Sequence, residues 1–162
     1  MKKDLEIILS EKFFGNVVSK IKKSRAKTTL KNLLKLRSKQ KTKQYINLHG
    51  KRVEVYDSET PENLRMIQSI ANRNYKAALS KLLKDFYETY KKTWVEPNQT
   101  ALTPQQFLRN LTPESISVYK SANGKITDIE ISFDAKDMFL GHWLTVQLLI
   151  PSGKPSYTNM YG

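Results

Sequence analysis

Two carboxylates and one imidazole lie close together near the C-terminal end of the sequence. Asp134, Asp137 and His142 fall within one segment that we expect to connect two β-strands. Carboxylate oxygens and imidazole nitrogens are ligands for several divalent metal ions. The spacing matches no specific metal motif, and turn formation explains the same residues, because aspartates bond turn backbone and Gly141 permits an unusual backbone conformation. We favour this structural role and assign no metal site and no catalytic residue to the segment.

Other groups that could carry out catalysis are few. The sequence has no cysteine and two histidines, so a thiol nucleophile and a thiolate metal site cannot form. The second histidine, His49, lies in a predicted turn, where we expect a solvated side chain. No glycine-rich phosphate loop of either common type is present. These residues favour a protein that is not an enzyme and binds no cofactor over an enzyme built around Asp134, Asp137 and His142.

Positive charge is concentrated in the first third of the chain. The net charge is +13, of which residues 1–60 contribute +10 and residues 61–162 contribute +3. No acidic residue lies between Glu11 and Glu54. Within this stretch a lysine recurs at every fourth position, at Lys27, Lys31, Lys35 and Lys39. Like charges at this spacing lie on one face of a helix and repel one another, which favours contact with an oppositely charged partner.

The predicted partner-binding residues are therefore basic and N-terminal. They are Lys20, Lys23, Lys27, Lys31, Lys35, Arg37 and Lys39. An acidic protein would form charge-assisted contacts with them and would associate faster because of the long-range attraction. Nucleic acid is the alternative partner, since the same side chains could neutralise phosphates. We place an acidic protein first because lysine dominates over arginine and no aromatic residue lies between Phe14 and Tyr45 for base stacking.

The spacing of apolar residues along the chain predicts an α+β fold, which must position the candidate residues named above. Amphipathic helices are expected over residues 5–21 and 26–40, so that the N-terminal region is helical and basic. Residues 45–56 change to an alternating pattern with a turn at His49-Gly50, which predicts a β-hairpin. A long central helix, in one piece or two, should begin after the N-cap Thr60.

The C-terminal part of the sequence favours strands after one short helix. Thr103-Pro104-Gln105-Gln106 is a capping box and predicts the start of that helix. Alternating apolar residues from Ile116 onward, with a turn at Asn123-Gly124, predict an antiparallel meander of three or four strands. Its apolar face should pack on the helices, because such a face must be buried against something.

Length and composition favour one domain over residues 1–162. We divide it into a basic helical region, residues 1–44, and a scaffold of hairpin, helix and meander, residues 45–162. Hydrophobic residues make up 39% of the chain, which is enough to form a core. The absence of cysteine suits a reducing compartment, and no apolar segment approaches the ~20 residues of a membrane-spanning helix. We expect a cytoplasmic protein that does not bind membranes.

Four stretches carry a resemblance to a known family. They are Lys92-Thr93-Trp94, the segment 102–108, the segment 111–116, and Asp137-Met138-Phe139-Leu140-Gly141-His142 followed by the final Gly162. Over residues 62–162 the chain resembles a family of uncharacterised bacterial α+β domains whose closing meander carries an Asp-x-Phe-x-Gly-His pattern. Ser152-Gly153-Lys154 stands where that family usually has Asp-Gly, and the basic first third lies outside the resemblance.

The resemblance implies a fold and supplies no functional residue. Some members of the family resemble immunity proteins that are encoded beside bacterial toxins. It therefore implies that the acidic partner of the basic face could be a toxin domain, which this protein would neutralise.

Overall fold

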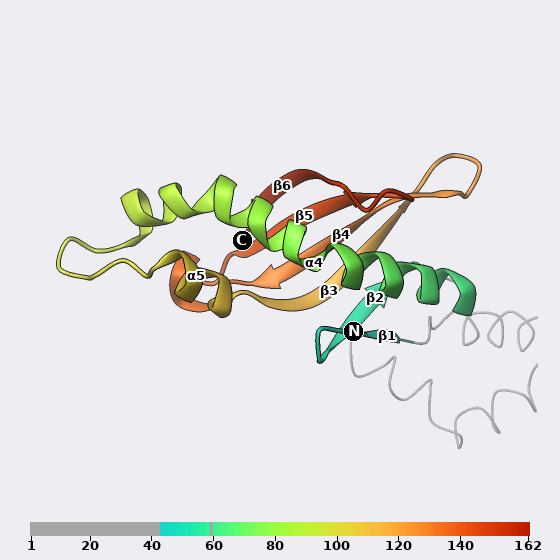
Figure 1. The fold of residues 1–162 in the computed structure, drawn as a ribbon, viewed down its shortest axis with the longest axis horizontal. Helices are drawn as coiled ribbons and strands as arrows, with labels where there is room; N and C mark the ends of the chain where they lie inside the picture. Colours follow the sequence, from blue (N-terminus) through green and yellow to red (C-terminus); the bar gives the residue numbers. More distant parts are fainter. Residues whose placement is uncertain (1–42, 59) are drawn as a thin grey trace, which may run out of the picture. The chain divides into compact units, whose positions relative to one another are not determined.

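A computed structural model describes residues 43–58 and 60–162, and the predicted N-terminal helices lie outside these residues. The described elements, in chain order, are β1 (Gln44–Leu48), β2 (Lys51–Tyr56), α4 (Pro61–Thr89), the π-helical turn η1 (Tyr90–Trp94), α5 (Pro104–Asn110), β3 (Thr112–Lys120), β4 (Ile126–Asp134), the 3-10 turn η2 (Lys136–Phe139), β5 (Trp143–Leu149) and β6 (Pro155–Tyr161) (Figure 1). The predicted α+β class is confirmed.

The strands form one six-stranded sheet in the order β1-β2-β3-β4-β5-β6. Neighbouring strands are antiparallel except β2 and β3, which are parallel. A parallel pair requires a long crossover, and α4, η1 and α5 supply it. The predicted meander thus comprises four strands, β3 to β6, and the hairpin extends the same sheet through the parallel pair.

The hairpin turn lies where the alternating pattern predicts it. His49 and Gly50 both have positive φ, 47° and 82°, as a two-residue turn matched to the twist of the strands requires. The Asn47 side chain stabilises this turn, because its Oδ1 accepts a hydrogen bond of 2.8 Å from the Gly50 backbone N–H.

The two predicted helix starts are confirmed by their caps. The Thr60 side chain accepts from the Asn63 backbone N–H, and proline occupies the first helical position of α4. Thr103 and Gln106 form a reciprocal capping box at the start of α5. The long helix is one continuous piece from Pro61, and it continues without a break into η1, which ends at Trp94.

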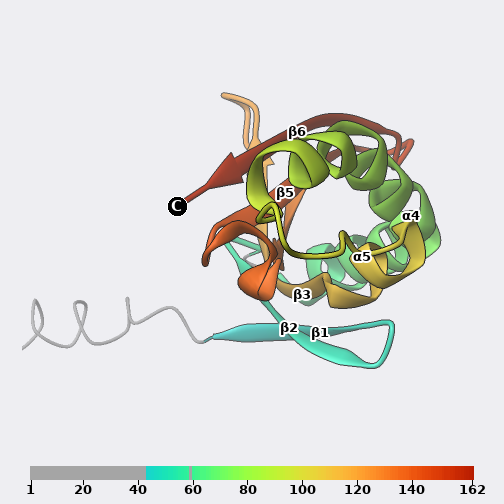
Figure 2. The same ribbon diagram turned by 90° about the vertical axis from the view of Figure 1, so that its left-hand side faces the viewer.

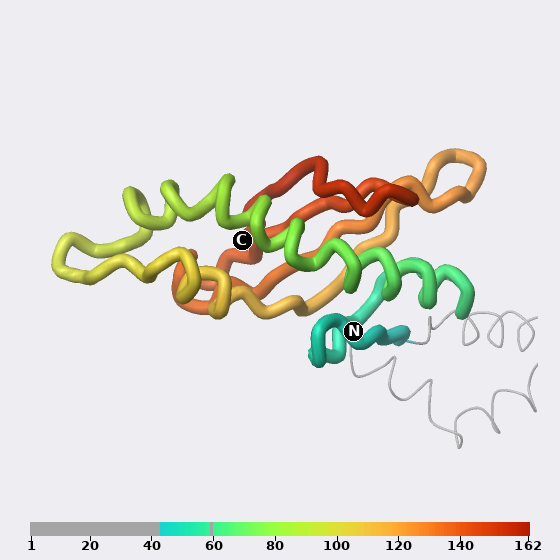
Figure 3. The backbone as a smooth tube through the Cα atoms, viewed as in Figure 1, coloured from blue at the N-terminus to red at the C-terminus, as the bar shows by residue number. Residues whose placement is uncertain are grey.

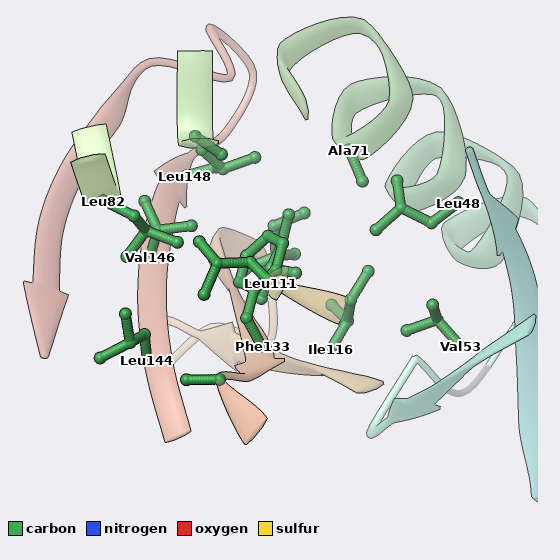
Figure 4. Packing of buried hydrophobic residues seen from close by; sticks show 14 of the residues in the cluster. Leu48, Val53, Ala71, Leu82, Leu111, Ile116, Phe133, Leu144, Val146 and Leu148 are labelled. Atoms are coloured by element: carbon green, nitrogen blue, oxygen red, sulfur yellow. The ribbon is translucent and has the colours of Figure 1, made fainter. Parts of the chain in front are cut away.

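The core lies between the sheet and the long helix. Helix α4 runs obliquely across the strands and contacts β1, β5 and β6 (Figure 3). Viewed from the end, α4 and α5 lie on the same side of the sheet (Figure 2). Residues from both layers meet in the interior, among them Leu82 of α4, Phe133 of β4 and Val146 of β5 (Figure 4). The opposite face of the sheet has no helix of the described residues packed on it.

Candidate functional site

The seven predicted partner-binding residues, Lys20, Lys23, Lys27, Lys31, Lys35, Arg37 and Lys39, fall among residues 1–42 and lie outside the described residues. The C-terminal end of the acid-free stretch is described, and it lies in the hairpin. Lys43 Nζ is 3.2 Å from Glu54 Oε2, and this hydrogen bond raises the pKa of the lysine. The Arg52 guanidinium lies 3.9 Å from the centre of the Tyr45 ring. These two cations have partners within the hairpin.

Asp134, Asp137 and His142 occupy the connection between β4 and β5, and each has a separate environment. Asp134 Oδ1 accepts a hydrogen bond of 2.7 Å from the Lys136 backbone N–H. Asp137 lines a cavity beside the start of η2. His142 Nδ1 lies 2.6 Å from the carbonyl oxygen of Phe139. Because a carbonyl can only accept, this contact places the ring hydrogen on Nδ1.

Metal binding finds no geometric support in this connection. Within residues 43–58 and 60–162, no group of three or more His, Cys, Asp or Glu side chains could hold a metal ion. The backbone of the connection instead has the turn conformations that its sequence suggested: Leu140 and Gly141 have φ of 50° and 87°. Glycine adopts such values without steric cost, whereas Leu140 does so with its side chain 80% exposed.

The Asp-x-Phe-x-Gly-His pattern is organised around Phe139. The ring of this fully buried residue contacts four other aromatic rings at centroid distances of 5.5–6.4 Å, those of Phe86, Tyr90, Trp94 and Phe107. His142 packs edge-on against Trp94 at 5.4 Å. At the C-terminus, a Cβ added to Gly162 would come within 2.5 Å of the His142 ring. Packing among α4, η1, α5 and η2 therefore explains why phenylalanine stands at position 139, histidine at 142 and glycine at 162.

A cavity of about 400 Å³ lies beside this aromatic cluster. Its lining combines aromatic, amide, hydroxyl and charged side chains: Tyr90, Trp94, Gln99, Thr100, Leu102, Asn110, Lys136, Asp137 and Met138. One cation and one anion oppose each other in charge, so the lining has no net preference for either sign.

The sheet face opposite α4 presents a different surface. In β3, β4 and β5 the residues on this face lie between core residues, although Thr145 on it is itself buried, and cross-strand pairs extend the face to β6. From β3 to β6 we define the open face as Ser117, Tyr119, Asp128, Glu130, Ser132, Asp134, Trp143, Thr145, Gln147, Leu149, Tyr157, Asn159 and Tyr161. Thr158 contacts α4 through Asp85, which directs its neighbour Tyr157 to the open face.

Exposed aromatic residues and carboxylates share the open face. Tyr119, Trp143, Tyr157 and Tyr161 are 44–55% exposed. Asp128, Glu130 and Asp134 all come from β4. None of the thirteen positions that define the open face is a lysine or an arginine, although the whole chain has a net charge of +13.

Neutral donors hold two of these carboxylates. Glu130 Oε1 accepts from the Tyr119 hydroxyl and Oε2 from the Thr145 hydroxyl, each at 3.3 Å. Asp128 accepts from the Gln147 side-chain amide and, at 2.8 Å, from the Thr127 hydroxyl. Partial burial, followed by the charge of Glu130 and the hydrogen bond to it, raises the pKa of Tyr119, so its hydroxyl remains a donor. The carboxylates of Asp128 and Glu130 are thus oriented by neutral partners.

The sequence analysis did not identify the open face as a candidate site. The sequence pattern that could have indicated this face lies in β5. There Trp143, Thr145, Gln147 and Leu149 alternate with core residues and face away from the core. Recognising it requires the strand register, because the carboxylates of β4 become neighbours of Trp143 and Tyr161 only across the strands.

Taken with the fold, this geometry defines a small α+β domain with a helix-covered core and a second sheet face that carries carboxylates and aromatic residues and that no helix among residues 43–58 and 60–162 covers. The chain belongs to the bacterial family DUF2262, described as "Uncharacterized protein conserved in bacteria", whose model matches residues 43–154. The predicted resemblance to an uncharacterised bacterial family is confirmed with different bounds. The match begins before residue 62, so that it includes the hairpin, and it ends at residue 154, before β6 and Gly162. No curated protein and no solved structure matches the chain. None of the described helices combines the length and apolar character needed to cross a membrane.

Proposed function

We propose that this is a non-enzymatic binding protein that engages an acidic protein through its basic N-terminal segment. The observation that carries the proposal is the segregation of charge along the chain. Residues 1–42 contain 13 lysine and arginine residues against three acidic ones, whereas residues 43–162 contain 15 against 12. The match to the bacterial family begins at residue 43, where the excess of basic residues ends.

The position of this boundary supports different roles for residues 1–42 and for the family domain that begins at residue 43. The described part of the chain forms one compact unit that begins at Lys43. The charge excess therefore belongs to a segment outside the family domain and is not a general property of its surface. A segment of that charge density attracts acidic surfaces over about 8 Å at physiological ionic strength.

The resemblance to immunity proteins makes a toxin domain the first acidic partner to test. Neutralisation by binding needs no catalytic group, only a complementary surface and fast association. The protein product of the gene beside this one is the natural candidate, and co-expression should relieve its toxicity if the proposal is right.

The central experiment compares two variants of the full chain that lose the same charge. One replaces the seven predicted partner-binding residues, Lys20, Lys23, Lys27, Lys31, Lys35, Arg37 and Lys39, with glutamine. The matched control replaces seven exposed basic residues of the described part, Lys51, Arg73, Lys76, Lys84, Lys92, Lys125 and Lys154. The probes are a polyglutamate peptide and a 20-base-pair DNA duplex, each titrated at 50 and 200 mM NaCl.

We expect the first variant to lose polyglutamate binding and the control to retain most of it. Equal losses in both variants would contradict the proposal, because net charge rather than the N-terminal segment would then drive binding. Binding to the duplex that is much tighter than to polyglutamate, with a steep salt dependence, would assign the segment to nucleic acid instead.

A further inference from the structure

The open face combines two features that favour cationic ligands. Carboxylates attract a cation by charge, and aromatic rings attract it through their electron-rich faces when it lies within ~6 Å of the ring centre. Asp134 of β4, Trp143 of β5 and Tyr161 of β6 are successive cross-strand neighbours in the register. In the next part of the face, Glu130 is the cross-strand neighbour of both Ser117 and Gln147.

The spacing of the carboxylates matches an extended chain. Residues two positions apart on a strand face are ~7 Å apart, and adjacent strands are ~4.8 Å apart. Asp128 and Glu130 are therefore separated by one such step, and Glu130 and Asp134 by two. A peptide lying along β4 in an extended conformation would bring basic side chains at relative positions 1, 3 and 7 over the three carboxylates.

We propose that the open face docks a lysine- or arginine-rich, extended peptide segment of a partner protein. The carboxylates of Asp128 and Glu130 are oriented by neutral hydroxyl and amide donors, so they are ordered before the ligand arrives and no cation of the described residues occupies them in these hydrogen bonds. Trp143 and Tyr161 flank the Asp134 end and provide ring faces for a cation. This surface is opposite in sign to the N-terminal segment, so the inference does not rest on the proposed function.

The probe is a nine-residue peptide with lysines at positions 2, 4 and 8, separated by glycine and serine and labelled with a fluorophore. A peptide of the same composition with its three lysines contiguous is the spacing control. Fluorescence anisotropy with the full chain should show tighter binding of the spaced peptide, and it should weaken as salt increases.

Charge variants locate the binding surface. The double variant Asp128→Asn with Glu130→Gln should weaken binding about fivefold, since each exposed ion pair contributes less than ~1 kcal/mol. The matched control is Glu62→Gln with Glu96→Gln, which removes the same charge at two exposed positions elsewhere. It should leave affinity within experimental error of the parent protein. Circular dichroism melting curves establish that the variants are folded.

One aromatic variant, compared with an aliphatic control, gives an independent measurement. Trp143→Ala should weaken peptide binding about threefold through loss of the ring face. Leu140→Ala, which changes a more exposed apolar side chain outside the open face, should have no effect. The glutamine variant of the seven N-terminal basic residues should bind the peptide as the parent does, which separates this result from the proposed function.

Three results would overturn the inference. Equal weakening by the two charge variants would show that the peptide senses net charge alone. Failure of the parent protein to bind the spaced peptide at low salt would remove the ligand class. Self-association of the protein that is lost in the Asp128 and Glu130 variant, without any peptide binding, would assign the face to a second copy of this chain.

Discussion

At the scale of single residues, Asn72 joins helix α4 to the hairpin turn through both atoms of its side-chain amide. Its Oδ1 accepts from the His49 backbone N–H at 3.2 Å, and its Nδ2 donates to the Asn47 carbonyl at 2.9 Å. The His49 ring completes the junction, because it lies 3.2 Å from the Asn72 carbonyl oxygen and stacks on Tyr75 with ring centres 4.3 Å apart. This junction holds the first two strands against the helix.

Replacing Asn72 with alanine should lower the free energy of unfolding by about 1 kcal/mol, since two hydrogen bonds across the junction are lost while alanine favours the helix slightly. Arg73→Ala is the matched control, because Arg73 is exposed on the same turn of α4. Urea unfolding followed by circular dichroism measures both. An Asn72 variant as stable as the Arg73 variant would show that the junction contributes nothing.

Asp85 joins the same helix to the last strand of the sheet. Its Oδ2 lies 2.6 Å from Lys81 Nζ and accepts a 2.6 Å hydrogen bond from the Thr158 hydroxyl of β6. Desolvation acts to raise the pKa of the carboxyl, but the bonds from Lys81 and Thr158 and the charges of Lys81 and Lys84 outweigh it. The folded-state pKa of Asp85 therefore lies below its ordinary value of 3.8.

A carboxyl with a lowered folded-state pKa contributes stability that is present above its unfolded-state pKa and lost as the pH falls through the folded-state pKa. The free energy of unfolding should therefore decrease as the pH falls below about 4. In Asp85→Asn, part of that decrease should be absent and the stability at pH 7 should be lower. Glu88→Gln serves as the control, because Glu88 forms an exposed helical pair with Lys91. Denaturation midpoints between pH 2.5 and 7 that change identically in both variants would contradict this role.

Some residue roles could not be predicted from the sequence, for a physical reason. His49 was expected to be a solvated turn residue; it is exposed, but it also bonds and stacks on α4. The partners of His49 and His142 are brought to them by tertiary packing, and residue type and spacing carry no information about those contacts. The turn conformation itself was predictable, because positive φ at His49-Gly50 follows from local backbone sterics.

At the scale of elements, the turn between β5 and β6 is fitted closely to α4. Gly153 has φ of 71°, and a Cβ at this position would lie 1.9 Å from Nδ2 of Asn74. The same Nδ2 is bonded to the Ile70 carbonyl at 2.8 Å, which fixes the amide in place. The turn between β3 and β4 differs, because Gly124 has φ of 79° but a Cβ there would meet nothing within 4 Å.

These two glycines allow backbone strain and packing to be separated. Gly124→Ala should lower the free energy of unfolding by about 1 kcal/mol through the left-handed backbone alone. Gly153→Ala should cost about 1–3 kcal/mol more, because the Asn74 side chain or the turn must also move. Thermal and urea unfolding of the two variants gives the comparison directly. Equal losses would show that the β5–β6 turn is not held tightly against α4.

Element boundaries were predictable where local chemistry determines them. The caps at Thr60 and Thr103 and the turns at residues 49–50 and 123–124 depend on neighbours in sequence, and the structure has them as expected. The parallel pairing of β2 with β3 was not predicted, because it joins residues about sixty positions apart and no local signal specifies it. The open face follows from the register of β3 to β6, which is likewise a property of the assembled sheet.

At the scale of the whole molecule, two charged features of opposite sign belong to different parts of the chain. The basic segment precedes the family domain, and the acidic open face lies within it, on strands that the family match mostly covers. The class of fold and the position of the basic segment could be derived from the sequence. The acidic face could not be derived from the sequence, because residues 43–162 have a net charge of +3 and the sequence does not show that three of their carboxylates lie on one face.

The parallel pairing of β2 with β3 has a consequence for folding during synthesis on the ribosome. Val55 of β2 pairs with Ile116 of β3, so the apolar hairpin leaves the ribosome long before its partner strand has been made. At about 5–20 residues per second, the intervening segment takes on the order of 3–12 s to synthesise. During that interval the nascent hairpin has an unpaired edge that other chains or chaperones can reach. Helix α4 emerges in the meantime and contacts β1, the other strand of the hairpin, so the edge of β2 stays unpaired until β3 has been made.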